Sequence, residues 1–303
     1  MQQYHSNGKL LLSAEYLILD GAVGLALPTT FGQHMEVFEN SNNFLTWESL
    51  DNTGKTWFKA DFDLPDLQIR QWEGDKNVAF TLKNILFTAK SMNPDFLEHN
   101  KGFKVTTQLD FPRNWGLGSS STLINNIAQW SATDAFRLLF ESFGGSGYDI
   151  ACAQNDTAIL YSLKNGLPLT EPVLFDPPFS DQLYFVHLNK KQVSSDSIAD
   201  YRTKNVEAGL IESISEISKL LLTCKHINNF NELLKLHESI IAGILETNPV
   251  QSKLFPDFFG QIKSLGAWGG DFVLATGDES TPSYFTDKGF ETVIRYNSMI
   301  KKI

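Results

Sequence analysis

The segment from Pro112 to Ser121 offers the clearest chemistry in the sequence. It reads Pro112-Arg113-Asn114-Trp115-Gly116-Leu117-Gly118-Ser119-Ser120-Ser121 and lies between a predicted strand and a predicted helix. Gly116 and Gly118 permit positive φ and a close approach of the backbone to a ligand. Unpaired amides and the positive end of the dipole at a helix start bind phosphate, and the serine hydroxyls can reach a phosphate or a magnesium ion. The pattern indicates a phosphate-binding loop, with a capped helix after a tight turn as the alternative.

The loop differs from two common nucleotide-binding fingerprints. No Gly-Lys-Ser/Thr follows the glycines, so it is not a Walker A loop. No GxGxxG opens a βαβ unit with an acidic residue downstream, which argues against an NAD-dependent oxidoreductase.

Two charged residues near the N-terminus are also candidates for chemistry. Lys9 begins an apolar run, where an ordinary surface lysine is the alternative. Glu15 lies inside that run, and a charge in so apolar a stretch is costly unless it is paired. We therefore expect Glu15 to have a specific role.

A second glycine-rich stretch spans Gly260 to Thr276. It contains Lys263-Ser264-Leu265-Gly266-Ala267-Trp268-Gly269-Gly270-Asp271 and precedes a predicted strand at Phe272 to Ala275. An ordinary glycine-rich hairpin is the alternative. Trp268 is unexpected in such a loop because tryptophan tolerates positive φ poorly.

The elements that must position these residues mix strands and helices without strict alternation, which predicts an α+β fold. Helices are expected at 78–92, 133–142, 197–224 and 231–247, and a further helix after the serines, with Ser119 or Ser120 as its N-cap. Strands are expected at 9–18, 23–28, 33–37, 44–48, 56–62, 103–109, 183–188, 272–275 and 292–296.

Composition excludes several other classes of protein. The 303 residues carry a net charge of −10 without a basic run, which argues against nucleic-acid binding. The two cysteines and six histidines (His5, His34, His99, His187, His226, His237) show no metal-binding spacing, and the thiols read as reduced and cytosolic. Glu15, Asp20 and two glycines interrupt the apolar stretch 10–27, which predicts buried strands and neither a signal peptide nor a membrane span.

Four segments in order resemble the GHMP kinases, named for galactokinase, homoserine kinase, mevalonate kinase and phosphomevalonate kinase. Pro112 to Ser120 matches every fixed position of the signature Pro-x-x-x-Gly-Leu-Gly-Ser-Ser. Residues 7–21 resemble the N-terminal motif, with Asn7 for proline and Ala14 for glycine. Residues 145–151 resemble the Ser-Gly-x-Asp segment of the mevalonate and phosphomevalonate kinases, and residues 263–271 resemble the C-terminal glycine motif, with Trp268 for a glycine.

The resemblance spans residues 7–271 and implies the two-domain GHMP kinase fold. Its N-terminal domain resembles the second domain of ribosomal protein S5, and its C-terminal domain is ferredoxin-like. We expect an N-terminal ATP-binding domain at 1–170 and a C-terminal domain at 171–303, because prolines cluster between residues 165 and 178.

The resemblance also implies ATP and Mg²⁺ as cofactors. ATP would bind Pro112, Gly116, Leu117, Gly118, Ser119, Ser120 and Ser121. The metal ligand would be Ser120 with a carboxylate, for which Glu141 and Asp134 are both candidates. Magnesium prefers oxygen ligands and keeps several waters, so this set would suffice.

Catalysis is expected from Asp149, which would accept the proton of the acceptor hydroxyl or orient that hydroxyl, with Lys9 beside it. Taken alone, Asp149 would read as a helix N-cap. Glu15, Tyr16, Ser146 and Gly147 are the expected substrate-binding residues.

The resemblance is strongest to the isoprenoid-biosynthesis members, so mevalonate is the first expected substrate. Phosphomevalonate kinase and diphosphomevalonate decarboxylase are alternatives, and a catalytically inactive ATP-binding protein is an alternative of another class. We expect a cytoplasmic protein whose partner is a small molecule, without nucleic acid or membrane, and either a monomer or a homodimer.

Overall fold

The computed structural model describes residues 1–98, 101–190 and 194–302, so His99 lies outside the described residues. The chain forms two compact units that are discontinuous in sequence. The first comprises residues 1–8, 31–113 and 117–154, and the second comprises residues 9–30, 114–116 and 155–303. The expected domain boundary after residue 170 stays a prediction.

The first unit is a sheet with helices against one face. Its strands follow the order β5-β4-β3-β6-β2, and β1 also pairs with β2. The strands are β1 (Gln2–Leu11), β2 (Gly24–Asn40), β3 (Phe44–Leu50), β4 (Thr56–Asp63), β5 (Ile69–Glu73) and β6 (Gly102–Leu109). The helices are α1 (Lys76–Met92), α2 (Ser119–Ser131), α3 (Ala135–Ser142) and α4 (Tyr148–Gln154).

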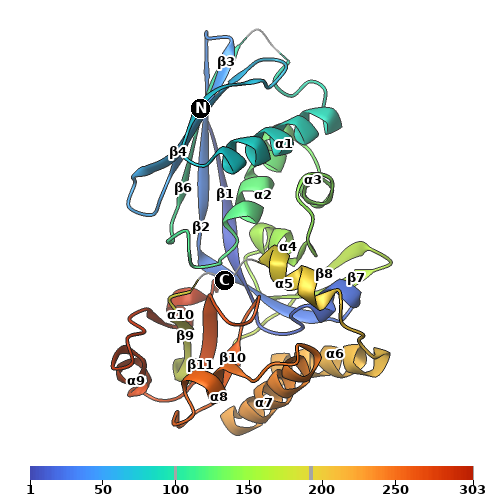
Figure 1. Cartoon of the computed structure of the whole chain (residues 1–303), viewed down its shortest axis with the longest axis vertical. Coiled ribbons are helices and arrows are strands. Elements are labelled where there is room, and N and C mark those ends of the chain that lie inside the picture. The colour runs from blue at the N-terminus through green and yellow to red at the C-terminus, as the bar shows by residue number, and fades with distance from the viewer. Residues whose placement is uncertain (99–100, 191–193, 303) are drawn as a thin grey trace. The chain divides into compact units, whose positions relative to one another are not determined.

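Alternation along β2 explains which face the helices cover. Met35 and Val37 are buried in the core with apolar residues of α1 and α2, whereas His34 is exposed. Successive strand side chains point to opposite faces. Figure 1 shows α1, α2 and α3 together on one side of these strands, so His34 faces the side that those helices leave open.

The second unit contains an antiparallel sheet in the order β10-β11-β9-β12. A hairpin of β7 and β8 pairs with the first residues of β2. The strands are β7 (Ile159–Lys164), β8 (Leu167–Pro172), β9 (Leu183–His187), β10 (Ile262–Ser264), β11 (Phe272–Thr276) and β12 (Val293–Arg295). The helices are α5 (Ser194–Tyr201), α6 (Ala208–Thr223), α7 (Ile227–Ile244), α8 (Val250–Leu254), α9 (Thr281–Thr286) and α10 (Tyr296–Met299), with short 3-10 turns η1 (Leu17–Asp20) and η2 (Ser180–Gln182).

The expected single helix at 197–224 is wrong, because the chain leaves the helix between α5 and α6. The Thr203 hydroxyl donates to the carbonyl of Asp200 at 2.7 Å, where α5 ends. The polar residues 202–205 also offer no apolar side chain to bury. The other expected helices are confirmed within a few residues at their ends.

The expected strand 9–18 is also wrong in its second half. β1 ends at Leu11, and Ala14 and Tyr16 then have positive φ values of 68° and 64°. A left-handed residue turns the chain out of a strand, so the segment folds back through η1. None of the helices in the described residues combines the length and apolarity that a bilayer crossing requires.

Candidate active site

The helix of the glycine-rich segment begins at Ser119, and Gly118 is its N-cap with φ 89° and ψ 41°. The expected serine N-cap is therefore wrong. The chain turns into the helix through a left-handed residue, which glycine adopts without strain. Glycine has no side chain that could cap the first-turn amides, and the Ser121 hydroxyl donates to the Gly118 carbonyl at 2.9 Å. The first-turn amides thus keep the arrangement that binds an anion.

A buried network of neutral polar groups holds α2 in place. Asn126 is fully buried, accepts from the Ser6 hydroxyl at 2.7 Å and donates to the Gln33 carbonyl at 3.0 Å. Asn125 donates to the Ser6 hydroxyl at 2.8 Å, and the Thr122 hydroxyl donates to Gln33 Oε1 at 2.8 Å. Hydrogen bonds to β1 and β2 therefore fix the helix that presents the serines.

The same network extends to α4, which carries Asp149. Gln154 Nε2, on the last residue of α4, donates to Asn125 Oδ1 at 3.0 Å. Asp149 lies in the first turn of α4, is half-buried, and accepts from the Ile150 amide at 3.1 Å. Ser146 and Gly147, just before this helix, are buried, and Gly147 has φ 87°. The first unit thus places Asp149 on a helix anchored directly to α2.

Asp134 and Glu141, the two candidate carboxylate ligands of magnesium, both contact Arg137 of α3. Asp134 is the N-cap of α3 and accepts from the Arg137 amide at 2.7 Å. Glu141 forms an ion pair with Arg137 at 2.7 Å. The exposed Ser120 hydroxyl carries no such contact among the described hydrogen bonds. Ser120 and Asp134 lie at opposite ends of α2, about 16 Å apart along the helix, so Asp134 is poorly placed to share an ion with Ser120. The expected role of Glu141 stays a prediction.

Residues 114–116 of the loop belong to the second unit, where Lys9 lies. Lys9 Nζ donates to the Gly116 carbonyl at 2.9 Å. Gly116 has φ 66°, and a Cβ there would lie 2.4 Å from the carboxyl carbon of Asp271, so a larger residue would be strained and would displace that carboxylate. His187 Nε2 lies 3.1 Å from the Asn114 carbonyl oxygen. The N-terminal lysine and the C-terminal glycine motif therefore meet at this part of the loop.

Sequence reasoning assigned no role to Asp271, although it is the last residue of the C-terminal glycine motif. In that motif Gly266, Gly269 and Asp271 have positive φ values of 61°, 92° and 51°, and Trp268 is not among the residues with positive φ. The tryptophan thus replaces a glycine at a position where the chain does not need one.

Glu15 and Tyr16 are buried in the second unit. The Glu15 carboxylate is 1% exposed, forms an ion pair with Lys263, and lies 3.2 Å from His237 Nε2. Tyr16 stacks on Tyr201 with ring centroids 5.3 Å apart. The Lys263 ammonium gives Glu15 the counter-charge that its apolar surroundings require. The expected contact of Glu15 with substrate stays a prediction.

The charges around Lys263 perturb one another strongly. Burial raises the pKa of Glu15 to about 7, against the attraction of the Lys263 ammonium. Burial also raises the pKa of Glu238 to about 8, again opposed by Lys263 and reinforced by the charge of Glu15. The Ala14 amide donates to His237 Nε2 at 2.9 Å, and burial lowers the pKa of His237 well below its usual value. The ring is therefore a neutral acceptor that holds the left-handed turn at Ala14.

Each unit therefore gathers part of the expected site. The first holds the helix start at Gly118 with Ser146, Gly147 and Asp149 on an adjoining segment, since α2 contacts α4. The second brings Lys9 to Gly116. Lys9 and Asp149 belong to different units, so their expected pairing stays a prediction.

Sequence comparison and structural comparison give different results. No protein-family model matches the sequence, and no curated protein matches it. The fold, by contrast, is similar to that of the Methanococcus jannaschii mevalonate kinase, with a TM-score of 0.71 and 15% identity over 96% of each chain. It is also similar to the Streptococcus pneumoniae phosphomevalonate kinase in complex with phosphomevalonate and AMPPNP, with a TM-score of 0.69 and 16% identity over 100% of this chain and 99% of that one.

A third similar structure is the Lactococcus lactis galactokinase in complex with galactose, with a TM-score of 0.67 and 13% identity over 94% of this chain and 88% of that one. Coverage of 94–100% of this chain by three such kinases confirms the α+β class and the fold that the four motifs implied. The chain thus has the fold of the GHMP kinases, as its phosphate-loop signature predicted.

Proposed function

We propose that this protein transfers the γ-phosphoryl group of ATP to a hydroxyl or phosphate group of a small metabolite, with mevalonate as the first candidate. The observation that carries the proposal is the start of α2, where the N-cap Gly118 is left-handed and has no side chain that could occupy the first-turn amides. That geometry offers first-turn amides to a phosphate. It occurs in the segment that matches the GHMP signature.

ATP would bind through the segment Pro112 to Ser121, with the amides at the start of α2 against its phosphates. Mg²⁺ would take the exposed Ser120 hydroxyl as one ligand and a carboxylate, Glu141, as another. Asp134 suits this role less, because it follows the C-terminal end of α2 whereas Ser120 lies at the other end, about 16 Å away along the helix. When bound, the ion neutralises charge on the phosphates.

Asp149 would accept a hydrogen bond from the acceptor hydroxyl and so orient it toward the phosphorus. Phosphoryl transfer depends mainly on positioning and charge neutralisation, so an orienting carboxylate on an anchored helix suits the reaction. Lys9 would stabilise negative charge on the transferring group. Its bond to the Gly116 carbonyl supports this role, because it keeps the ammonium beside the phosphate loop.

The choice of mevalonate rests on the Gly8-Lys9, Glu15-Tyr16 and Ser146–Asp149 matches to the isoprenoid kinases. The similar structures include a phosphomevalonate kinase and a galactokinase, so the acceptor must be found by experiment. Phosphomevalonate is the second candidate acceptor.

The test is ADP release from Mg-ATP with mevalonate, phosphomevalonate, diphosphomevalonate, homoserine and several sugars. We expect turnover with mevalonate, and turnover with another compound would reassign the acceptor. Release of carbon dioxide from diphosphomevalonate would identify a decarboxylase. ATP binding without turnover on any compound would support the inactive ATP-binding alternative.

The variant Asp149→Asn tests the catalytic assignment. It should lower turnover by roughly 10²–10⁴-fold while ATP binding persists, the usual effect of removing an acid–base group. The exposed Asp95→Asn serves as the matched control in the same unit and should keep full turnover. Full activity of Asp149→Asn would refute the role.

A further inference from the structure

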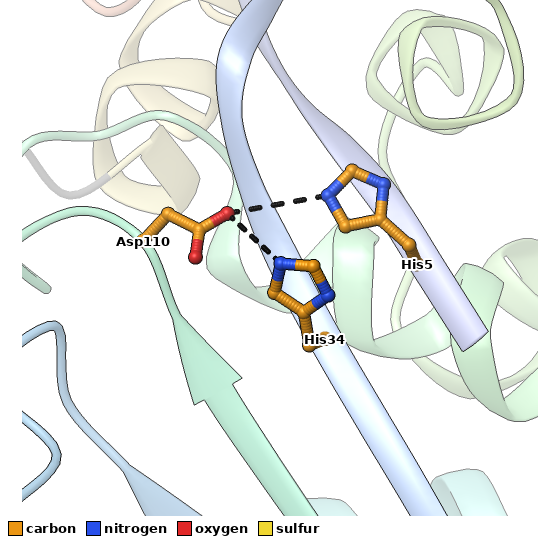
Figure 2. A group of neighbouring side chains, drawn as sticks. All are labelled: His5, His34 and Asp110. Carbon is orange, nitrogen blue, oxygen red and sulfur yellow. Dashed lines mark ion pairs between the residues drawn. The ribbon is translucent and has the colours of Figure 1, made fainter. Parts of the chain in front are cut away.

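Two histidines and an aspartate gather on the sheet of the first unit. His5 comes from β1, His34 from β2, and Asp110 follows the last residue of β6. Figure 2 shows the Asp110 carboxylate directed at both imidazole rings. His34 Nε2 lies 3.4 Å and His5 Nε2 lies 4.0 Å from the same oxygen, Asp110 Oδ2.

These three atoms have nearly the spacing of a metal's ligands. All of them lie within 4.8 Å of one another. Two atoms bound at about 2.0–2.1 Å to a tetrahedral zinc ion are about 3.4 Å apart. The His34–Asp110 separation already has this value, and His5 Nε2 must approach Asp110 by about half an ångström. The two imidazole nitrogens, which lie within 4.8 Å of each other, must also reach this spacing.

Gly32 positions two of these three residues, through its backbone amide and through its lack of a side chain. Its amide donates to Asp110 Oδ2 at 3.2 Å, which orients the carboxylate. A Cβ at this position would lie 2.6 Å from His5 Nε2 and 2.4 Å from the Ser6 carbonyl oxygen. The missing side chain therefore leaves room for the His5 ring, and a backbone bond to a ligating carboxylate is typical of metal sites.

A hollow lies next to the two histidines on this face. It has a volume of about 490 Å³, and its lining includes His5, His34, Glu36 and Gln108. His34 pairs with Gln108, and Glu36 with Thr106, across β2 and β6. An ion held by three protein ligands here would have space for water or another ligand at its remaining positions, as in open zinc sites.

We propose that His5, His34 and Asp110 bind one divalent transition-metal ion of the zinc class. Imidazole favours Zn²⁺, Ni²⁺ and Cu²⁺, whereas Mg²⁺ prefers oxygen ligands and dehydrates reluctantly. The site would therefore be distinct from the magnesium site proposed for the kinase reaction. The bound ion would link β1, β2 and the end of β6, from which the chain continues into the loop at Pro112.

Equilibrium dialysis of the full-length protein against Zn²⁺, in the presence of millimolar Mg²⁺, tests the proposal. We expect one zinc ion per chain. His34→Gln and Asp110→Asn should each lower the affinity by at least the 10–100-fold that loss of an outer-shell partner costs. The exposed His226→Gln, in the second unit, is the matched control and should bind zinc as the unaltered protein does.

Two further measurements separate binding from misfolding. Because an ion that binds the native state raises the thermal midpoint, zinc should do so in the unaltered protein and in His226→Gln but not in His34→Gln. Circular dichroism in EDTA should show that all variants are folded, since the substituted side chains are at least one-third exposed. Unchanged zinc affinity in His34→Gln and Asp110→Asn, or displacement of zinc by Mg²⁺, would overturn the proposal.

Discussion

The two units bury polar groups of different kinds. In the first, neutral amides and hydroxyls around Asn125 and Asn126 hold α2 and α4. In the second, charged groups around Lys263 hold the turn at Ala14 and Glu15. Burial of a neutral group costs little once it is hydrogen-bonded, whereas a buried charge depends on its counter-charge. The first network should therefore be insensitive to pH, and the second should respond to both pH and the loss of one partner.

Removal of Lys263 should have the largest effect on stability. Lys263→Met leaves Glu15 and Glu238 buried without their counter-charge. We expect a loss of about 3–5 kcal/mol in the free energy of unfolding, measured by urea denaturation at pH 8. Lys219→Met is the control, because that ammonium is half exposed on α6. A loss below about 1 kcal/mol would contradict the view that this lysine stabilises the turn.

The second prediction concerns pH. The folded-state pKa values of Glu15 and Glu238, about 7 and about 8, lie above the ordinary 4.5, so the folded protein binds protons that the unfolded chain has lost. Stability from these carboxyls is full below pH 4.5 and is lost as pH rises through 7 and 8. His237 acts oppositely: its lowered pKa removes stability as pH falls below its ordinary 6.5.

The effect of the two carboxyls on stability can therefore be measured alone between pH 6.5 and 9, where His237 no longer contributes to the pH dependence. Urea denaturation across it should show a decline of at most about 1.4 kcal/mol per pH unit for each carboxyl. Glu238→Gln should flatten the decline, whereas the exposed Glu232→Gln on the same helix should not. An identical decline of stability with pH in Glu238→Gln and in the unaltered protein would show that Glu238 is not the source of that decline.

A third prediction tests the neutral network. Asn126→Ala removes the partner of the Ser6 hydroxyl and of the Gln33 carbonyl. Each buried group left unsatisfied costs about 1–3 kcal/mol, so we expect a loss in that range that stays constant between pH 6.5 and 9. Gln129→Ala, exposed on the same helix, should change stability little. A loss that changes with pH would contradict the expectation that the neutral network of the first unit, unlike the charged one of the second, is insensitive to pH.

The smallest expected effect comes from a charge at the surface of the first unit. The Arg113 guanidinium lies 3.5 Å from the centre of the Trp57 ring. A double-mutant cycle of Arg113→Gln and Trp57→Leu should give a coupling of about 0.5–1 kcal/mol, the range for cation–π pairs at exposed sites. A coupling as large as the loss in Lys263→Met would show that burial is not what separates strong from weak charges in this protein.

Local signals in the sequence account for much of the fold. Apolar spacing predicted α1, because Leu82, Ile85 and Leu86 form one buried face of that helix. The glycines and serines at 116–121 predicted a turn into a helix, although the helix begins one residue after a glycine cap. The helix at 197–224 was mispredicted, because the polar residues 202–205 interrupt the apolar pattern where the chain leaves the helix between α5 and α6.

The candidate site was less accessible to sequence reasoning. A glutamate in an apolar run signalled that Glu15 needed a partner, but Lys263 lies 248 residues further along the chain. The indication for Asp271 was weaker, since it is only the acidic last residue of the glycine motif at 263–271. Its contact with Gly116 became visible only when the second unit was complete.

The sequence by itself determined the phosphate-loop signature, the α+β class and most element positions, because these depend on neighbouring residues and on regular spacing. Only the tertiary structure decided which distant side chains meet. His5, His34 and Asp110 show no metal spacing along the chain, yet pairing of β1 and β6 with β2 brings them within 4.8 Å of one another. Strand register and burial set such contacts, and both are properties of the folded chain as a whole.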